Sequence, residues 1–499
     1  MGLSQDDRRP AGAAVVTAPP GRVMLDDVEM TPFLKRVTLF SSGGPFLDGY
    51  VLSIIGVALI QLGPALDLDA TWTAVVGVAA LVGLFLGTSV GGWLTDVIGR
   101  KKMFVIDIVA IGVLSVGTAF VGTPLMLVVM RFLIGIVIGA DYPIATSLIA
   151  EFTPRKHRAI SMGIVAAAWY LGANVAFLVG YLLMDVDGGW RWMLASAVVP
   201  CLVILIGRWD IPESPRWLAR KGRGAEAGAI VRRIFGADVE LEPETTSKVG
   251  YATLFRRGYV GKILFVGTIW MCQAVPMFAI YTFGPRIMTE FGFGAGQTAT
   301  IGEMIIGTFF MVGCIPAMFW ANSMGRRKLL IGSFAIMTVA LAVLGILPTA
   351  AMPVVIVCLA LYAFFSGGPG NLQWLYPNEL FPTDVRASAV GAAMAFSRIG
   401  TVVSTYVLPG FLAAYGTRAT MTAGAVISGL GLLVSVLWAP ETRGLTLVEA
   451  SALRLGIRGR RAGSGPRTAG TPDSPTGTGT PLTTSDRGPR GDLQGDGSR

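Results

Sequence analysis

The segment Glu151-Phe-Thr-Pro-Arg-Lys-His-Arg158 has a counterpart later in the chain, Glu379-Leu-Phe-Pro-Thr-Asp-Val-Arg386. The glutamate, the proline and the last arginine of the two segments are each 228 residues apart. Pro212-Glu213 recurs at the same distance as Pro440-Glu441. This pattern predicts a tandem duplication, in which each copy is one structural unit and the function lies between the copies.

The composition indicates that each copy is a bundle of membrane-spanning helices. Mean hydropathy is +0.63, 53% of the 499 residues are hydrophobic and only 14% are charged, which is too apolar for a water-soluble protein. The apolar residues fall in runs of about 20, the length that crosses a bilayer. Twelve runs are expected: 37–63, 71–95, 103–122, 124–151, 160–183, 191–209, 261–285, 299–322, 329–348, 353–377, 388–414 and 419–439. The predicted fold is an all-α integral membrane protein with two six-helix bundles, residues 37–209 and 261–439.

Basic residues indicate the orientation of these spans. They collect in alternate loops and in the connector 210–260, a pattern that predicts both termini and the connector on the cytoplasmic side of the cytoplasmic membrane. The formal charge of +9 is then a topology feature, and we expect no nucleic-acid partner.

The segments outside the two bundles are predicted from composition. Residues 1–36 form a cytoplasmic segment with no removable signal peptide. Within the connector, residues 225–235 are expected to form a short amphipathic helix at the membrane surface. The cytoplasmic tail 440–499 is expected to be disordered after about residue 461.

Several chemistries are excluded by residue counts. The single histidine, His157, allows neither a histidine-based triad nor a multi-histidine metal site within one chain. The four cysteines are far apart and lie inside apolar runs, as small buried hydrophobes do. No G-x-x-x-x-G-K-[ST] phosphate-binding loop is present. We therefore expect no enzyme, cofactor or metal site, and uphill movement of a solute would use a gradient.

Four motifs resemble those of the major facilitator superfamily. Gly92-Trp-Leu-Thr-Asp-Val-Ile-Gly-Arg-Lys101 resembles its loop between helices 2 and 3, and Arg131-x-x-x-Gly-x-x-x-Gly139 resembles its helix 4 motif. Pro212-Glu-Ser-Pro-Arg-Trp-Leu218 and Pro440-Glu-Thr-Arg-Gly444 are similar to the paired marks of its sugar porter branch. The resemblance covers residues 48–449. It implies a transporter in which one six-helix half rocks against the other.

The motif charges are predicted to form a conformational clamp. Asp96 can accept hydrogen bonds from helix N-terminal amides or from arginines, while Gly99 permits a tight turn. The second half has Asn322 at the position of Asp96, so its clamp lacks this carboxylate. A plainer interpretation is that these charges only stop helices at the membrane surface. The predicted clamp residues are Gly92, Asp96, Gly99, Arg100, Lys101, Arg131, Glu151, Arg158, Glu213, Arg216, Gly325, Arg326, Glu379, Arg386 and Glu441, of which Arg131 is expected to support packing inside the first half.

The residues that contact substrate are expected on helices 7, 10 and 11. Breaks at Pro276 and at 367–370 free nearby groups for a ligand. The expected set is Gln273, Tyr281, Asn371, Gln373, Trp374 and Arg398. It resembles sugar porters only in part, because helix 7 keeps one of the usual paired glutamines. Aromatic residues in such helices are also often packing residues.

Three carboxylates inside spans are candidates for proton coupling, since a charged group at a helix centre costs about 2.5 kcal/mol or more. They are Asp48, Asp141 and Glu303. Asp48 is preferred because helix 1 lines the central cavity in this superfamily. Alternatively, the aspartates pair with Arg131 or cap a helix break. Arg398 would attract an anion or neutralise Glu303.

The sequence thus predicts a monomeric secondary transporter of a sugar or polyol, coupled to protons and working by alternating access in a lipid bilayer. The alternative is an organic-anion and proton symporter, because Asp48-Gly-Tyr50 and Gly139-Ala-Asp-Tyr-Pro143 resemble such proteins. A drug exporter is less favoured because helix 5 lacks the Gly-Pro motif of antiporters. A nontransporting nutrient sensor would need apolar docking segments, which residues 462–499 lack.

Overall fold

The computed structural model describes residues 23–24, 29–152, 158–236, 239–240, 259–292, 294, 296–347, 352–381, 383–445, 450 and 453. The chain divides into two units, Met1–Gly459 and Arg460–Arg499, and every described residue belongs to the first. The tail predicted to be disordered after about residue 461 lies outside the described residues.

The described helices account for twelve membrane spans. Ten segments are long and apolar enough to cross a membrane by length and composition. A further helix, α4 (Arg100–Thr118), is of similar length but carries Lys101, Lys102 and Asp107. The helix α16 (Thr383–Trp438) holds two spans, because Gly416 breaks it with a φ of 74°. The prediction of twelve helices is confirmed.

Two spans of the first half each consist of two consecutive helices. Its first span is α1 (Pro32–Ser41) followed by α2 (Gly43–Ala65), and its sixth is α7 (Gly189–Ala195) followed by α8 (Val198–Arg208). The spans between them are α3 (Ala70–Ile98), α4, α5 (Pro124–Phe152) and α6 (Arg158–Leu183).

The second half begins with α12 (Val260–Glu290), which kinks at Phe283. It continues with α13 (Gln297–Ser323), α14 (Arg326–Ile346), α15 (Met352–Leu380) and the two arms of α16.

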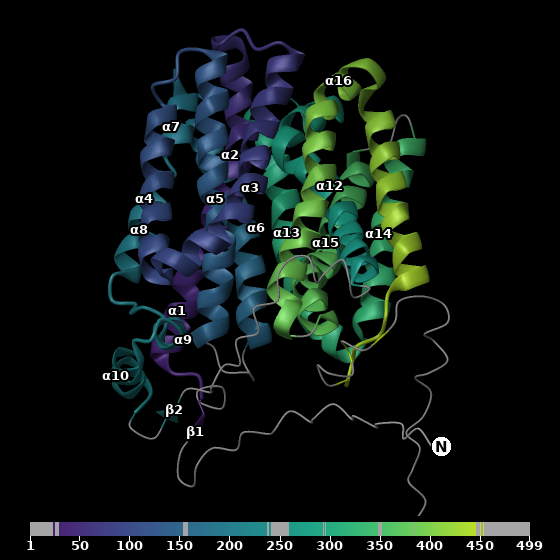
Figure 1. Cartoon of the computed structure of the whole chain (residues 1–499). Helices are drawn as coiled ribbons and strands as arrows, with labels where there is room; N and C mark the ends of the chain where they lie inside the picture. Colours follow the sequence, from purple (N-terminus) through teal and green to yellow (C-terminus); the bar gives the residue numbers. More distant parts are fainter. Residues whose placement is uncertain are drawn as a thin grey trace, which may run out of the picture. The chain divides into compact units, whose positions relative to one another are not determined.

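The connector forms α9 (Pro215–Arg220) and α10 (Gly224–Phe235), and the latter matches the predicted amphipathic helix. A two-residue parallel pair joins β1 (Val23–Met24) to β2 (Val239–Glu240). The helices α9 and α10 lie at one end of the spans, here called the connector end, and the opposite end is called the far end (Figure 1).

Close helix packing depends on small residues within the first half. The helix α3 packs most extensively against α5. A Cβ at Gly135 would overlap the carbonyl oxygen of Ala80, and one at Gly87 would overlap that of Ile136. Glycine therefore lets the two backbones touch, as small residues do in membrane helix pairs.

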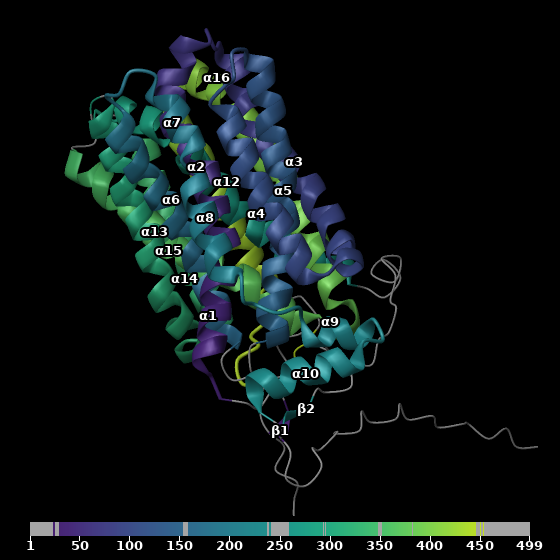
Figure 2. The ribbon, with the colours of Figure 1, turned by 90° about the vertical axis from the view of Figure 1, so that its left-hand side faces the viewer.

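The two halves meet most extensively along α6 with α13, α3 with α16, and α2 with α12 (Figures 1 and 2). Large apolar side chains point outward, among them Leu182 at 64% exposed, Ile206 at 71% and Phe319 at 68%. An apolar exterior suits lipid, whereas in water it would favour aggregation.

Candidate functional site

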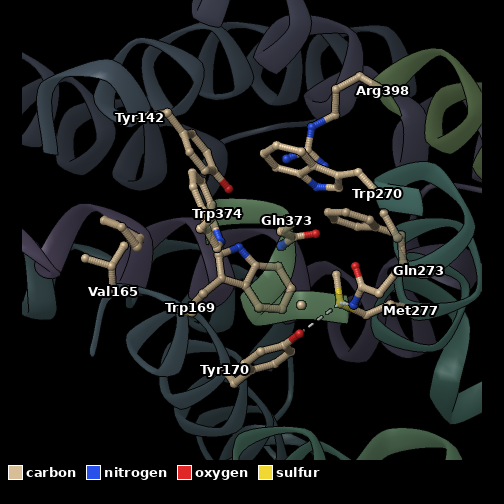
Figure 3. A pocket seen from close by; sticks show the side chains of 15 residues that line it. Tyr142, Val165, Trp169, Tyr170, Trp270, Gln273, Met277, Gln373, Trp374 and Arg398 are labelled. Atoms are coloured by element: carbon tan, nitrogen blue, oxygen red, sulfur yellow. Dashed lines mark hydrogen bonds between the residues drawn. The ribbon is translucent and has the colours of Figure 1, made fainter. Parts of the chain in front are cut away.

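A cavity between the two halves is the candidate ligand site (Figure 3). The volume of this cavity is about 40 Å³, whereas typical ligand pockets have a volume of roughly 300 Å³ or more. A sugar-sized molecule therefore requires side chains or helices to move. Its lining residues are Pro45, Tyr142, Val165, Ala166, Trp169, Tyr170, Trp270, Gln273, Ala274, Met277, Phe278, Gly370, Gln373, Trp374 and Arg398.

Aromatic rings close this cavity by contact across the two halves. Tyr142 of α5 stacks on Trp374 of α15, with ring centroids 6.0 Å apart and planes 12° apart. Trp169 of α6 meets Phe278 of α12 edge-on at 5.9 Å. Because each pair joins opposite halves, these contacts must break when the halves separate. These aromatic side chains therefore line the cavity and also close it.

Polar groups of the second half add hydrogen-bonding capacity to the cavity. Gln273 donates to the Ser366 hydroxyl at 3.0 Å. Gln373 has a buried Oε1 with no hydrogen-bond partner among the described residues. Arg398 is 4% exposed, its guanidinium carbon lies 5.5 Å from the Phe278 ring centroid, and it forms no ion pair with a described residue. Buried polar groups are normally paired, so these two side chains are suited to a polar ligand.

Asp48 lies directly behind the cavity lining. Its Oδ2 accepts hydrogen bonds from the Tyr142 hydroxyl and from Trp169 Nε1, the latter at 2.6 Å. Its Oδ1 has no partner among the described residues, and Arg398 attracts it electrostatically. A change in the charge of Asp48 is therefore transmitted directly to two residues of the lining.

Arg131 does not pair with these carboxylates. Its Nη1 donates to the carbonyl oxygen of Val51 at 2.9 Å, which ties α5 to α2 inside the first half. The described contacts thus give Arg131 the packing role expected from its motif, and they include no ion pair with Asp48 or Asp141.

The other two candidate carboxylates lie outside the lining. Asp141 is buried, as is Asp107 of α4, and both interact electrostatically with Arg208. Glu303 of α13 is fully buried against Gly284, and neither of its oxygens has a partner among the described residues. In particular, no ion pair joins Glu303 to Arg398 there.

Four of the six predicted substrate residues line the cavity: Gln273, Gln373, Trp374 and Arg398. Tyr281 lies outside it and stacks on Phe177 with centroids 5.7 Å apart. Asn371 also lies outside and donates to the Cys314 carbonyl oxygen at 2.7 Å.

Sequence reasoning missed most of the aromatic lining. Trp270 and Met277 stand three residues before and four after Gln273, so helical periodicity places them on the same face of α12. That spacing could have identified them. Trp169 and Tyr170 of α6 had no comparable pattern, because an aromatic pair in an apolar helix is equally typical of packing.

At the connector end, equivalent glutamates cap equivalent helices in the two halves. Glu213 accepts the backbone N–H groups of Arg100 and Lys101 at 3.0 and 3.1 Å. Glu441 accepts those of Arg326 and Arg327 at the same two distances. A carboxylate at a helix N-terminus binds unpaired amides and the positive end of the helix dipole.

The turn before each capped helix requires glycine. Gly99 has a φ of 112° and Gly325 one of 94°, values that other residues rarely adopt. A Cβ at Gly99 would also lie 2.6 Å from a Glu213 oxygen. The backbone amides at the start of α4 are therefore bonded to Glu213.

In the second half an ion pair lies beside the Glu441 cap. Arg326 pairs with Glu379 at 2.8 Å, and Glu379 accepts the Thr442 hydroxyl at 2.5 Å. All these contacts remain inside one half. Arg216 is half-buried in the first turn of α9, and Gly92 lies in α3. The side chains of Asp96, Glu151, Arg158 and Arg386 lie outside the described residues.

Two pseudo-symmetric six-helix halves with a ligand site between them define a membrane transporter that works by alternating access. Residues 37–453 match the family model described as "Sugar (and other) transporter". The chain belongs to this family, the sugar porters of the major facilitator superfamily.

Three comparisons illustrate the relationship. The chain is 58% identical over 438 residues to the putative metabolite transport protein YaaU of Escherichia coli (strain K12), covering 88% of this chain and 98% of the relative. It is 29% identical to the glucose transporter GlcP of Staphylococcus epidermidis, covering 81% and 94%. The solved structure of the proton:xylose symporter XylE bound to 6-bromo-6-deoxy-D-glucose superposes with a TM-score of 0.72 at 22% identity, covering 84% and 99%.

Proposed function

We propose that this protein carries a sugar or polyol across the cytoplasmic membrane together with a proton. The observation that supports this most strongly is the central cavity, which both halves line and which Asp48 contacts through two of the lining residues.

The lining suits a molecule with both apolar faces and hydroxyl groups. The C–H face of a sugar ring packs on flat aromatic surfaces such as Trp169 and Trp374, and the amides of Gln273 and Gln373 donate to and accept from hydroxyl groups. The similarity to a glucose transporter along most of the chain favours the same substrate class.

Asp48 is the proposed proton carrier, ahead of Asp141. A buried carboxyl group is stabilised in its neutral form, and contact with water stabilises the charged form. Separation of the aromatic pairs would expose Asp48, so its proton would be loaded on one side and released on the other. Glu303, which no cavity residue contacts through a described hydrogen bond, is proposed to stay protonated throughout the cycle.

The connector end is proposed to face the cytoplasm, with both chain termini on that side and the protein acting as a monomer. The argument is the concentration of Lys101, Lys102, Arg326 and Arg327 at the starts of α4 and α14. The Glu213 and Glu441 caps would then stabilise each half as a rigid body while the halves rock.

Uptake into proteoliposomes tests this function. Purified protein is given labelled xylose, glucose, inositol or benzoate, with an imposed pH difference and the membrane potential held at zero by a potassium ionophore. We expect accumulation of at least one sugar or polyol that needs the pH difference. Accumulation of benzoate alone would contradict the sugar assignment.

The second candidate is symport of an organic anion with protons. Arg398 supports it, since its buried guanidinium faces the cavity without a described ion pair. The sugar is favoured because Asp48 provides a negative charge close to the same guanidinium.

A further inference from the structure

A second cavity, here called the side cavity, lies between the two halves next to the central one. Its volume is about 330 Å³, against about 40 Å³ for the central cavity. Both halves contribute to its lining, which includes Phe85 and Thr88 of α3 and Gly391, Met394, Ala395 and Arg398 of α16. Of these residues, only Arg398 also lines the central cavity. The two cavities therefore adjoin at this side chain.

The side cavity lies on the connector side of the central cavity. Its residues follow the middle of α3 and precede the middle of the first arm of α16, and the end of α3 and the start of α16 both lie at the connector end (Figure 1). Gly391, Ala395 and Arg398 are spaced by four and three residues, so they share one face of α16. The contact of α6 with α13 is closely packed on the same side of the membrane, because a Cβ at Gly163 would overlap the Met318 sulfur. A molecule that moves between the central cavity and the connector end therefore has space beside α3 and α16.

The lining of the side cavity offers both hydrogen bonds and apolar contact. Arg398 is buried, and its Nε has no hydrogen-bond partner among the described residues, so a ligand oxygen would satisfy it. The Thr88 hydroxyl donates to a carbonyl oxygen of its own helix at 2.8 Å, and its oxygen can still accept a hydrogen bond. Phe85 adds an aromatic surface, on which the C–H groups of a sugar ring can pack.

We propose that the side cavity is a second binding site for the transported sugar or polyol, which the molecule occupies between the central cavity and the connector end. The class of ligand rests on the function proposed above. The volume of the side cavity falls within the range of ligand pockets, whereas the central cavity is too small in this conformation. Because Arg398 reaches both sites, the molecule keeps one partner while it leaves the amides of Gln273 and Gln373. Thr88 then binds the molecule only in the second site.

Affinity labelling tests whether a sugar binds in the side cavity. Gly391→Cys introduces a thiol there, since a Cβ at this position would meet no described atom within 4 Å, and the four native cysteines are buried. The purified variant is treated with the bromoacetylated glycosylamines of glucose and xylose, and separately with bromoacetamide, which has the same reactive group without a sugar. We expect at least one sugar reagent to react about tenfold faster or more, because binding holds its reactive group beside the thiol. Excess free sugar should remove this preference, and equal rates for all three reagents would overturn the proposal.

Two further variants serve as controls. Gly261→Cys at the start of α12 also has open space around its Cβ and lies away from both cavities, so it should react with all reagents at equal rates. Adding Thr88→Val to Gly391→Cys removes the hydroxyl with little change in size. We expect this change to slow the sugar reagent about fivefold, the effect of one hydrogen bond, and to leave bromoacetamide unaffected. Equal slowing of both reagents would contradict binding by Thr88.

The labelling is done in detergent and needs no transport, so it separates this proposal from the proposed function. A sugar preference at position 391 without uptake of any sugar or polyol into proteoliposomes would support the second site and contradict the transport function. Uptake of glucose or xylose without a preference at position 391 would overturn the second site alone. Absence of both would contradict both proposals.

Discussion

Replacing Asp48 by asparagine separates proton coupling from substrate movement. Asparagine has nearly the same size, and its amide oxygen can still accept from the Tyr142 hydroxyl and Trp169 Nε1, so the cavity should keep its shape. The variant cannot carry a proton. We therefore expect it to exchange substrate at equal pH and to lose accumulation driven by a pH difference.

The expected size of the effect on substrate accumulation follows from the transport of one proton in each cycle. One pH unit corresponds to about 1.4 kcal/mol, or a tenfold concentration ratio per proton. With Asp48 as the single carrier, a difference of about 1.5 pH units supports a ratio of about 30 in the unsubstituted protein and of about 1 in Asp48→Asn. Exchange should stay within a few-fold, because asparagine can still accept both hydrogen bonds from the cavity lining.

The assay is the proteoliposome experiment described above, run at several pH differences with the potential held at zero. The logarithm of the accumulation ratio should rise by one for each pH unit. Glu303→Gln is the matched control and should accumulate normally. Undiminished accumulation by Asp48→Asn would refute the assignment, and a slope near two would show that a second proton also moves.

Three further predictions follow from single contacts. Glu213→Gln and Glu441→Gln should lower the free energy of unfolding by similar amounts, about 1 kcal/mol each, since both remove a charged cap of the same geometry; clearly unequal losses in thermal unfolding would contradict their equivalence. Arg398→Gln should reduce sugar uptake less than tenfold, whereas a substrate anion would lose its charge partner and about a hundredfold or more in uptake, corresponding to about 3 kcal/mol. Gly122→Cys should react with an impermeant thiol reagent outside intact cells, and Gly224→Cys, on the proposed cytoplasmic side, should not. Both positions have free space for a side chain, and the four native cysteines are buried. Labelling at position 224 would reverse the orientation.

The membrane spans were predictable because each one needs a continuous apolar segment of about 20 residues, and the repeat shows the same order of segments twice. The breaks within spans were not. The first span divides at Ser42, and the last two join into one helix apart from Gly416. Hydropathy averages over such positions, and the residues beside Ser42 contact Arg208 and Asp141, which are distant in sequence.

The polar part of the cavity was more predictable than its aromatic part. Gln273, Gln373 and Arg398 stood out because polar groups are rare in apolar helices. Trp169 did not, since tryptophan in a membrane helix has many uses, and its contacts with Asp48 and Phe278 arise only when α2, α6 and α12 meet.

The two halves share a six-helix arrangement but differ in the polar residues that they bury. The glutamate caps repeat closely, but the first half buries Asp48, Asp107 and Asp141, while the second half supplies Gln373 and Arg398 to the cavity. The proposed proton sites therefore lie in one copy of the repeat, and most polar cavity groups lie in the other. They meet across the interface, where Tyr142 donates to Asp48 and stacks on Trp374 of the opposite half. Since separating the halves must break that stack, the protonation state of Asp48 and the closure of the cavity act on the same tyrosine. In the proposed mechanism, the coupling of the duplicated bundle therefore arises from residues that differ between its two copies.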